Sequence, residues 1–304
     1  MKKSTISNYI KEKALQVGFD ACGIAKADFV GEDAEFLSHW LEKGHHGKMS
    51  YLANHFEKRT NPQLLEENAR SVIVVLLNYF PRTTQPSDVP QVAKYAYGND
   101  YHLVIKNKLY ELLALIKDEC PEVKGRTFTD SAPILERYWA KQAGLGWIGK
   151  NTNLIHPQFG SFCFIGELLV NIELDYDQPL QDHCGKCIKC IEHCPTHAIL
   201  PNKTLAATDC ISYLTIELKE DIPLPLVSKM NNRVFGCDIC QDVCPWNRKA
   251  KAHQIADFIP KKDFLTLTSE EWKNMNETQF KSIFANSALK RAGFEKIRKT
   301  INNL

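Results

Sequence analysis

The pattern of apolar and polar residues in the first 175 positions predicts helices and strands in alternation. Residues 71–77 form a continuous apolar, β-branched run and are predicted to be a strand covered on both faces. Residues 162–170 are predicted to be another buried strand. Amphipathic helices are expected over residues 4–17, 36–43, 103–119 and 133–143. Helices that alternate with buried strands predict a layered α/β domain.

Eight of the 11 cysteines lie in the following part of the chain, between residues 184 and 244. The first run reads C-x2-C-x2-C-x3-C-P, the bacterial ferredoxin spacing in which three thiolates bind one cluster and the fourth binds another. In the second run Val234 stands where the first cysteine would be, and Cys210 is the obvious substitute. Eight thiolates are enough for two [4Fe-4S] clusters. By this crossing we expect one cluster on Cys184, Cys187, Cys190 and Cys244, and the other on Cys194, Cys210, Cys237 and Cys240.

Two other interpretations of these cysteines remain. C-x2-C pairs also bind structural zinc, but zinc needs neither the third cysteine two residues on nor a proline after the last cysteine of each run. Disulfides would require export, and Met1 is followed by a polar amphipathic segment instead of an apolar signal sequence. We therefore expect iron–sulfur clusters in a cytoplasmic protein without a membrane segment.

Composition adds a division into parts and a candidate partner. A chain of 304 residues fits two domains or one domain with appendages. The expected parts are an α/β domain over 1–178, a ferredoxin-like domain over 179–250 and a helical segment over 251–304. From residue 248 onward there are twelve lysines and arginines against six acidic residues, although the net charge of the whole chain is only +2. This basic segment suits RNA, or is merely a solvated helical surface.

A glycine-rich run, Gly144-Leu-Gly146-Trp-Ile-Gly149-Lys150, imitates two nucleotide-binding motifs. A P-loop needs Ser or Thr after the lysine, where this chain has Asn151, and both motifs need a preceding strand. A helix is expected there instead. Nucleotide binding is therefore not favoured, and close approach of this backbone to some other ligand remains attractive.

Asp130 is the candidate acid, with two interpretations. It precedes the helix expected over 133–143 and so could cap it. Alternatively it is a general acid, which requires an apolar surround, from Phe128, Trp139 and Trp147, to keep the carboxyl protonated. The stretch from Asp100 to Ile105 approaches the cobalamin motif D-x-H-x-x-G but lacks its glycine, so no cobalt ligand is expected there.

Taken together, these residues resemble the epoxyqueuosine reductase family over nearly the whole chain. The resemblance rests on Tyr97-Gly-Asn-Asp-Tyr-His102, Asp130-Ser-Ala-Pro133, residues 143–151, Cys210-Ile-Ser212 and both cysteine runs. It implies an α/β (α+β) cobalamin-binding domain related to reductive dehalogenases, a ferredoxin-like domain with two [4Fe-4S] clusters and a short helical C-terminal segment.

By the same resemblance, the chain would reduce epoxyqueuosine to queuosine at the wobble position of tRNA. Electrons from an external low-potential donor would pass through the clusters to base-off cobalamin, and Asp130 would protonate the departing oxygen. The residues that the resemblance implies, or that we expect, to contact the corrinoid are Arg59, Asp130, Leu154, Ile165, Ser212 and Asp238. A cysteine that some members carry near the cobalt is absent, because Ala93 and Ala96 occupy that neighbourhood. The protein is expected to be a monomer whose tRNA contacts come from Lys290, Arg291, Lys296, Arg298 and Lys299.

Two other classes of function compete with this one. A corrinoid reductive dehalogenase would usually be exported and membrane-associated, which the polar N-terminus and the basic segment do not favour. A ferredoxin-like electron carrier would leave about 170 residues of α/β domain without a role.

Overall fold

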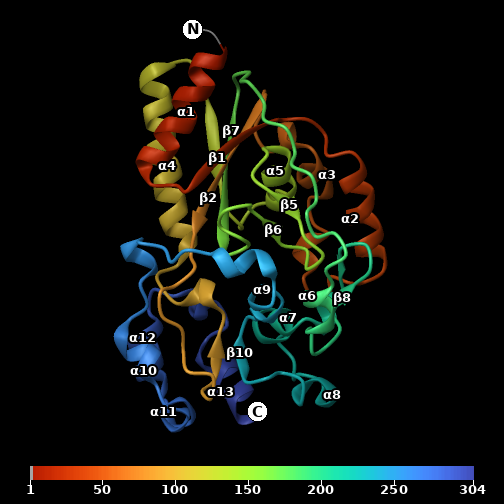
Figure 1. Cartoon of the computed structure of the whole chain (residues 1–304), viewed down its shortest axis with the longest axis vertical. Helices are drawn as coiled ribbons and strands as arrows, with labels where there is room; N and C mark the ends of the chain where they lie inside the picture. The colour runs from red at the N-terminus through yellow and green to blue at the C-terminus, as the bar shows by residue number, and fades with distance from the viewer. Residues whose placement is uncertain (1–2) are drawn as a thin grey trace.

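The computed structural model describes residues 3–304 and is built on a four-stranded antiparallel sheet (Figure 1). The strand order is β1-β2-β7-β4, with β1 at Ala21–Lys26, β2 at Ser71–Asn78, β7 at Cys163–Val170 and β4 at Gly125–Phe128. The two apolar runs are confirmed as β2 and β7, the central strands, and every residue of β2 is buried.

Helices cover both faces of this sheet, which explains why its central strands are apolar on both sides (Figure 1). One face packs against α1 (Lys3–Val17) and α4 (Tyr101–Glu119), and the other against α5 (Glu136–Gln142). Along β7, Phe164 and Leu168 join the first core, whereas Ile165 and Leu169 join the second. Two shorter helices, α2 (Glu32–Glu42) and α3 (Phe56–Thr60), lie beyond α5.

A third core joins segments that are far apart in the sequence. After β2 the chain forms β3 (Gln91–Val92), which pairs in parallel with β10 (Arg233–Phe235). Four helices complete this core, namely α10 (Lys262–Thr266), α11 (Ser269–Asn274), α12 (Glu277–Phe284) and α13 (Phe294–Asn302). Residues 89–97 thus pack with both later parts of the chain, and the division at 178 and 250 stays a prediction.

The cysteine-rich part consists of short elements. Its helices are α6 (Lys189–Glu192), α7 (Ile211–Ile216), α8 (Leu224–Val227) and α9 (Ile239–Asp242), and its hairpin pairs β8 (Ile199–Leu200) with β9 (Thr204–Leu205). Another hairpin, β5 (Trp147–Ile148) with β6 (Leu154–Ile155), connects it to the sheet domain.

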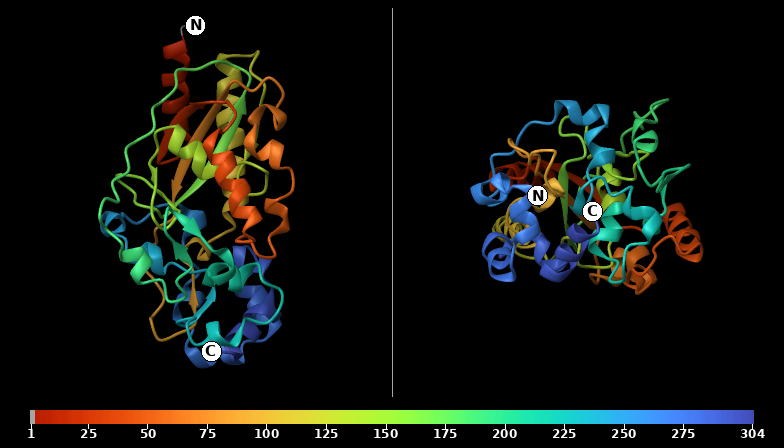
Figure 2. Two further views of the ribbon diagram at one scale, coloured as in Figure 1. Left: turned by 90° about the vertical axis from the view of Figure 1, so that its right-hand side faces the viewer. Right: turned by 90° about the horizontal axis from the view of Figure 1, so that it is seen from below.

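The molecule is elongated, with the sheet in one half and the C-terminal helices in the other (Figure 2). Among residues 3–304, no helix is both long enough and apolar enough to cross a bilayer.

Candidate active site and cluster sites

Asp130 lies in the loop between β4 and α5, where two side chains from the start of α4 reach it. The Tyr101 hydroxyl donates a hydrogen bond to Asp130 Oδ2 at 2.9 Å, and His102 Nε2 lies 3.0 Å from the same oxygen. The Asp130 N–H donates to the Glu136 carboxylate. Its φ of +52° is left-handed, a conformation that non-glycine residues adopt only when their surroundings enforce it. The hydrogen bonds therefore hold this loop in one conformation.

The capping interpretation of Asp130 is wrong. Helix α5 begins at Glu136, its N-cap is Leu135, and no side chain caps it. Asp130 precedes the helix by a full loop and faces α4 instead. Its neighbour in space, Asp100, is the residue that caps α4, accepting from the His102 N–H at 3.1 Å.

The expected apolar surround of Asp130 is also wrong. Phe128 and Trp139 are buried in the core under α5, and Trp147 packs beside Cys244. The Asp130 side chain itself is 42% exposed and has polar neighbours. Burial raises the pKa of Asp130, but the hydrogen bonds with His102 and Tyr101 outweigh it and leave the pKa below its usual value. In this conformation Asp130 is an ionised carboxylate near neutral pH.

The proton of this site is held by His102. Its ring lies between two carboxylates, with Nδ1 2.6 Å from Asp100 Oδ1 and Nε2 3.0 Å from Asp130 Oδ2. Burial lowers the pKa of His102, but the hydrogen bonds to Asp100 and Asp130 outweigh burial and raise it to about 9. His102 is therefore an imidazolium at neutral pH, with both N–H groups donated to carboxylates. The incomplete cobalamin motif indicated that His102 is not a cobalt ligand, but no sequence pattern indicated this role in proton storage.

A cation from the far end of the chain completes the site. Arg291 Nη1 lies 3.9 Å from Asp130 Oδ2, and Arg291 Nη2 pairs with Glu217 at 2.7 Å. Arg291 was expected to contact tRNA, and the structure places it beside the candidate acid. The surplus of basic residues in the C-terminal segment made Arg291 a candidate for tRNA contact. No local sequence pattern indicates that it lies beside Asp130.

The first group of predicted cluster ligands surrounds a common space. Cys184, Cys187, Cys190 and Cys244 all line one cavity of about 40 Å³. Burial raises the pKa of the Cys190 thiol, and the charges of the other three raise it further. Among residues 3–304, no three His, Cys, Asp or Glu side chains gather tightly enough to bind a single metal ion. These four thiols instead border a volume, which is the geometry that a multinuclear cluster requires.

The second group also gathers, from both cysteine runs and the segment between them. Burial raises the pKa of Cys210, and the charge of Cys194 adds to it. Burial raises the pKa of Cys237 to about 12, with Cys210 again contributing. The pKa of Cys240 is raised by burial, then by Cys237 and Cys210, and also by Cys190 of the first group. The two groups therefore adjoin each other, where α6 packs against α9.

The glycine-rich run packs against the first cysteine group. A Cβ on Gly146 would lie 2.3 Å from the Ile155 carbonyl oxygen, so this glycine allows β5 and β6 to approach. Lys150 Nζ donates to the Gly185 carbonyl at 2.7 Å, and Asn151 lines the cysteine cavity with Lys150. Close approach of this backbone to a ligand other than a nucleotide stays a prediction.

Two of the expected corrinoid contacts are apolar residues beneath the Asp130 loop. Leu154 and Ile165 both pack in the core under α5. The hydroxyl of Thr129 donates to the Ile165 carbonyl at 3.2 Å, which ties β7 to this loop.

Besides Asp130, the other three are polar and lie in the cysteine-rich part or next to it. Arg59 is buried and donates to the Tyr51 carbonyl at 3.1 Å, but its Nε has no hydrogen-bond partner. Ser212 lies on α7, whose neighbouring Tyr213 hydroxyl accepts from the Lys48 N–H at 2.9 Å. This hydrogen bond holds the loop that precedes α3 against α7, and Arg59 lies on α3.

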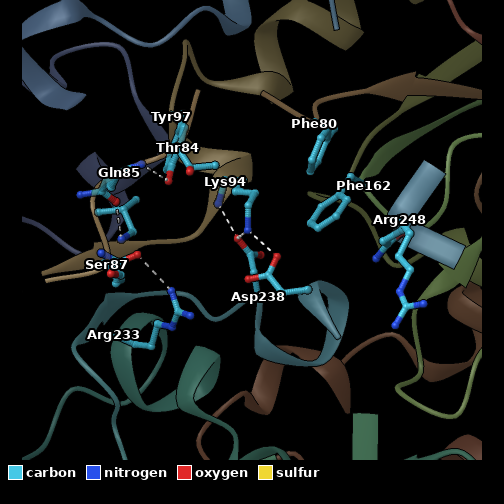
Figure 3. A pocket seen from close by; sticks show the side chains of 14 residues that line it. Phe80, Thr84, Gln85, Ser87, Lys94, Tyr97, Phe162, Arg233, Asp238 and Arg248 are labelled. Atoms are coloured by element: carbon cyan, nitrogen blue, oxygen red, sulfur yellow. Dashed lines mark hydrogen bonds and ion pairs between the residues drawn. The ribbon is translucent and has the colours of Figure 1, made fainter. Parts of the chain in front are cut away.

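Asp238 lies in the wall of a separate cavity of about 420 Å³, shown in Figure 3. It is buried, accepts from the Lys94 N–H at 2.7 Å, and has its Oδ2 3.5 Å from Lys94 Nζ. Burial raises the pKa of Asp238 despite this cation. Phe162, Arg233 and Arg248 line the same cavity, whereas Asp130 does not. The structure therefore does not bring Asp238 and Asp130 into one pocket.

Comparison with known proteins agrees with both halves of this arrangement. Residues 59–131 match the model of the family described as epoxyqueuosine reductase QueG, DUF1730, and residues 183–247 match a 4Fe-4S double cluster binding domain. The epoxyqueuosine reductase of Cellulophaga algicola is 47% identical over 302 residues, covering 99% of each chain.

Solved structures give the same result. A crystal structure of epoxyqueuosine reductase with an epoxyqueuosine-modified tRNA-Tyr stem loop has a TM-score of 0.88 and 28% identity, covering 98% of this chain and 80% of that one. The Bacillus subtilis enzyme, in a form with an aspartate catalytic loop swung out of its active site, has a TM-score of 0.87 at 27% identity, with the same coverage. A catabolic reductive dehalogenase shares the fold, with a TM-score of 0.51 at 15% identity over 99% of this chain and 38% of that one.

The nearly full-length match to a relative at 47% identity, with the double cluster domain in the expected place, decides the family. This chain belongs to the epoxyqueuosine reductases, which are oxidoreductases.

Proposed function

We propose that this protein reduces epoxyqueuosine to queuosine in tRNA and that the Asp130–His102 pair supplies a proton to the departing oxygen. The observation that carries the proposal is the hydrogen-bonded pair itself: a histidine whose pKa is about 9 lies 3.0 Å from a carboxylate that is 42% exposed. Such a pair stores a proton at neutral pH and presents it at the surface of the site.

The residues present fit a corrinoid and two clusters. Arg59 has a buried Nε without a partner, as expected of a donor waiting for a polar group, and Leu154 and Ile165 offer apolar contacts. Ser212 and Asp238 are the other proposed contacts, and the eight cysteines are the proposed cluster ligands in the two sets described above. When bound base-off, cobalamin supplies low-potential electron chemistry toward the epoxide, replenished through the clusters by an external donor.

Proton delivery follows from the competition that sets the pKa of Asp130. Solvent access and the imidazolium keep Asp130 ionised before substrate arrives. A substrate that covers the exposed carboxylate removes water from it, which favours the neutral form. The proton of His102 then moves along the 3.0 Å contact to Asp130, which donates it to the epoxide oxygen. Tyr101 holds the carboxylate in place throughout.

The tRNA substrate is proposed from the relatives and from the basic C-terminal segment. Lys290 is exposed at this end of the molecule and has no acidic partner in the described part of the chain. Arg298 and Lys299 instead pair with Glu295 and Asp221, so their charges are partly compensated. A tRNA substrate also places the protein in the cytoplasm, and its monomeric state remains a proposal.

The test is a turnover experiment. The protein is reconstituted anaerobically with iron, sulfide and cobalamin, then incubated with epoxyqueuosine-containing tRNA and a chemical reductant. Digestion of the tRNA to nucleosides should show queuosine replacing epoxyqueuosine. Unchanged epoxyqueuosine with fully loaded protein would overturn the proposal.

A further inference from the structure

The two cysteine groups lie at different depths in the molecule. In the first group, the residues that directly follow Cys184 and Cys187 are exposed. In the second group, the residues that directly follow Cys210, Cys237 and Cys240 are buried. Helix α6, in the first cysteine run, also lies nearer the edge of the molecule than α9, in the second run (Figure 1). The first group is therefore the one that borders solvent.

The second group lies on the side of the active site. Helix α7 begins directly after Cys210, and Glu217 follows the last residue of this helix. Glu217 pairs with Arg291 at 2.7 Å, and Arg291 lies beside Asp130. The first group adjoins the second where α6 packs against α9. From solvent inward, the order is thus first group, second group, active site.

The exposed side of the first group combines an apolar side chain with two cations. Ile188 is 45% exposed, and the lysines on either side of it in the sequence, Lys186 and Lys189, are exposed as well. Within residues 3–304, neither lysine has an acidic partner. We call these three residues the entry surface. Electron-transfer complexes have small, weak interfaces, and an apolar centre with a charged rim is the usual composition of an interface.

The charges around the entry surface are mainly positive. Lys150 Nζ donates to the Gly185 carbonyl at 2.7 Å, which holds a third lysine at the same loop. Asp182 is paired with Lys203 at 2.8 Å, so its charge is compensated, and Glu192 lies at the end of α6. Four lysines and two acidic residues thus surround this loop, a surplus of two positive charges. Such a surplus favours encounter with a negatively charged partner.

The position of the entry surface favours a protein over RNA as that partner. The proposed tRNA substrate has to reach Asp130, which lies beyond the second cysteine group as seen from the entry surface. The entry surface instead borders thiols that are the proposed ligands of a cluster. What a partner can exchange at this place is an electron.

Resting on the proposed function, we propose that the entry surface is the docking site for an acidic protein that carries a low-potential one-electron centre. In each encounter the centre of the partner is oxidised by one electron and the cluster on the first group is reduced by one. No bond breaks and no proton moves in this step. Two encounters supply the two electrons that removal of one epoxide oxygen as water consumes.

The test measures electron transfer from a defined partner. The loaded protein is mixed anaerobically with a reduced, acidic plant-type [2Fe-2S] ferredoxin, and visible absorption gives the second-order rate constant. The double variant Lys186→Glu/Lys189→Glu should lower this rate constant tenfold or more at about 20 mM salt, because its charges repel the acidic carrier. At about 500 mM salt the difference should shrink to about twofold, because exposed charges are then screened.

A second double variant is the matched control. Lys106→Glu/Lys117→Glu makes the same change of charge at two exposed lysines of α4 and should accept electrons from ferredoxin as wild type does. With a small chemical reductant in place of ferredoxin, the entry-surface variant should keep the wild-type iron content and form queuosine at the wild-type rate. Equal losses in both double variants, or a loss that salt does not change, would overturn the inference.

Binding of tRNA separates the remaining alternative. If the entry-surface variant binds epoxyqueuosine-containing tRNA more weakly but accepts ferredoxin electrons as wild type does, the surface belongs to the RNA and the inference is wrong. Failure of wild type to form queuosine with a chemical reductant would instead overturn the proposed function. Reduction of wild type by ferredoxin would still be measurable in that case, so the two failures are distinguishable.

Discussion

At the scale of single residues, the site works by competition between burial and hydrogen bonds. Burial lowers the pKa of His102, but its hydrogen bonds to Asp100 and Asp130 outweigh burial and make it an imidazolium. Burial raises the pKa of Asp130, but its hydrogen bonds with His102 and Tyr101 outweigh burial and keep it a carboxylate. The Asp130 side chain is still partly exposed. A ligand that changes only the exposure of this carboxylate can therefore move a proton.

The first prediction concerns stability and pH. The folded state raises the pKa of His102 from about 6.5 to about 9, so it favours the protonated form. Its contribution to the free energy of unfolding is complete below pH 6.5 and is lost as the pH rises through 9. At one pKa unit for about 1.4 kcal/mol, this contribution is roughly 3–4 kcal/mol.

Urea unfolding of wild type and His102→Gln measures it. The stability difference should be largest near pH 6 and should disappear near pH 10. His39→Gln, at an exposed histidine on α2, is the matched control. A difference that stays constant across this range would contradict the assigned imidazolium.

The second prediction separates chemistry from folding at Asp130. Asp130→Asn keeps an acceptor for Tyr101 but cannot carry the transferred proton. Clusters and corrinoid should remain bound while turnover falls about 100-fold or more. Iron and cobalt content and the rate of queuosine formation are the measurements, and full activity would remove Asp130 from proton transfer.

The third prediction tests the ligand that lies outside both motifs. Cys210→Ala should lower the iron content to about half, because one of two clusters loses a thiolate. Cys22→Ala, a cysteine packed against the sheet core, is the matched control and should leave iron unchanged. Iron that stays complete in Cys210→Ala would rule this thiol out as a ligand.

Sequence alone located residues whose spacing carries information, and it missed those whose role depends on the fold. The eight cysteines and Asp130 belong to recognisable local patterns. Cys184, Cys187, Cys190 and Cys244 line one cavity, and the assignment of all eight cysteines to two clusters is still a prediction. Arg291 has no local pattern, and it reaches Asp130 from the C-terminal segment. The pKa of Asp130 was misjudged because the residues that set it come from α4.

At the scale of elements, the active-site loop depends on how closely α5 lies on the sheet. Helix α5 ends next to β1, where a Cβ on Gly23 would lie 2.0 Å from the Ala143 carbonyl oxygen. The helix can therefore approach β1 only because this position lacks a side chain. The hydrophobic pattern predicted both the helix and the strand. It could not predict the distance between them, because that distance depends on the absence of a side chain at Gly23.

The fourth prediction follows from this contact. Gly23→Ala should push α5 away from β1 and destabilise the protein by about 1–3 kcal/mol, as overpacking commonly does. Turnover should fall as well, because Glu136 and the Asp130 loop move with the helix. Gly44→Ala, at a glycine with free space around it but a left-handed φ of +67°, measures backbone strain without a clash. A Gly23→Ala variant that melts and turns over as wild type does would contradict the close packing.

At the scale of the whole molecule, the parts expected from composition share a core. Val92 from the segment after β2, Phe235 from β10, and Trp272 and Phe284 from the C-terminal helices all pack in it. Sequence analysis placed the boundaries where composition changes, but pairing of β3 with β10 depends on residues more than a hundred positions apart. Such contacts are invisible to local patterns.

The fifth prediction tests this shared core. Removal of residues 251–304 should expose Val92 and Phe235 and prevent cooperative folding, instead of merely weakening tRNA binding. Circular dichroism melts and iron content measure this outcome. Lys290→Ala, which leaves the core intact, should melt as wild type does. A truncated chain with a sharp melt and full iron would show that the segment is an independent appendage.

The contact between Arg291 and Asp130 has a consequence for biosynthesis. A ribosome releases the sheet, the cysteine runs and the candidate acid well before it releases residue 291. Arg291 also follows every predicted cluster ligand in the chain. The charge beside the candidate acid is therefore completed by a residue that is synthesised after the whole cysteine-rich part.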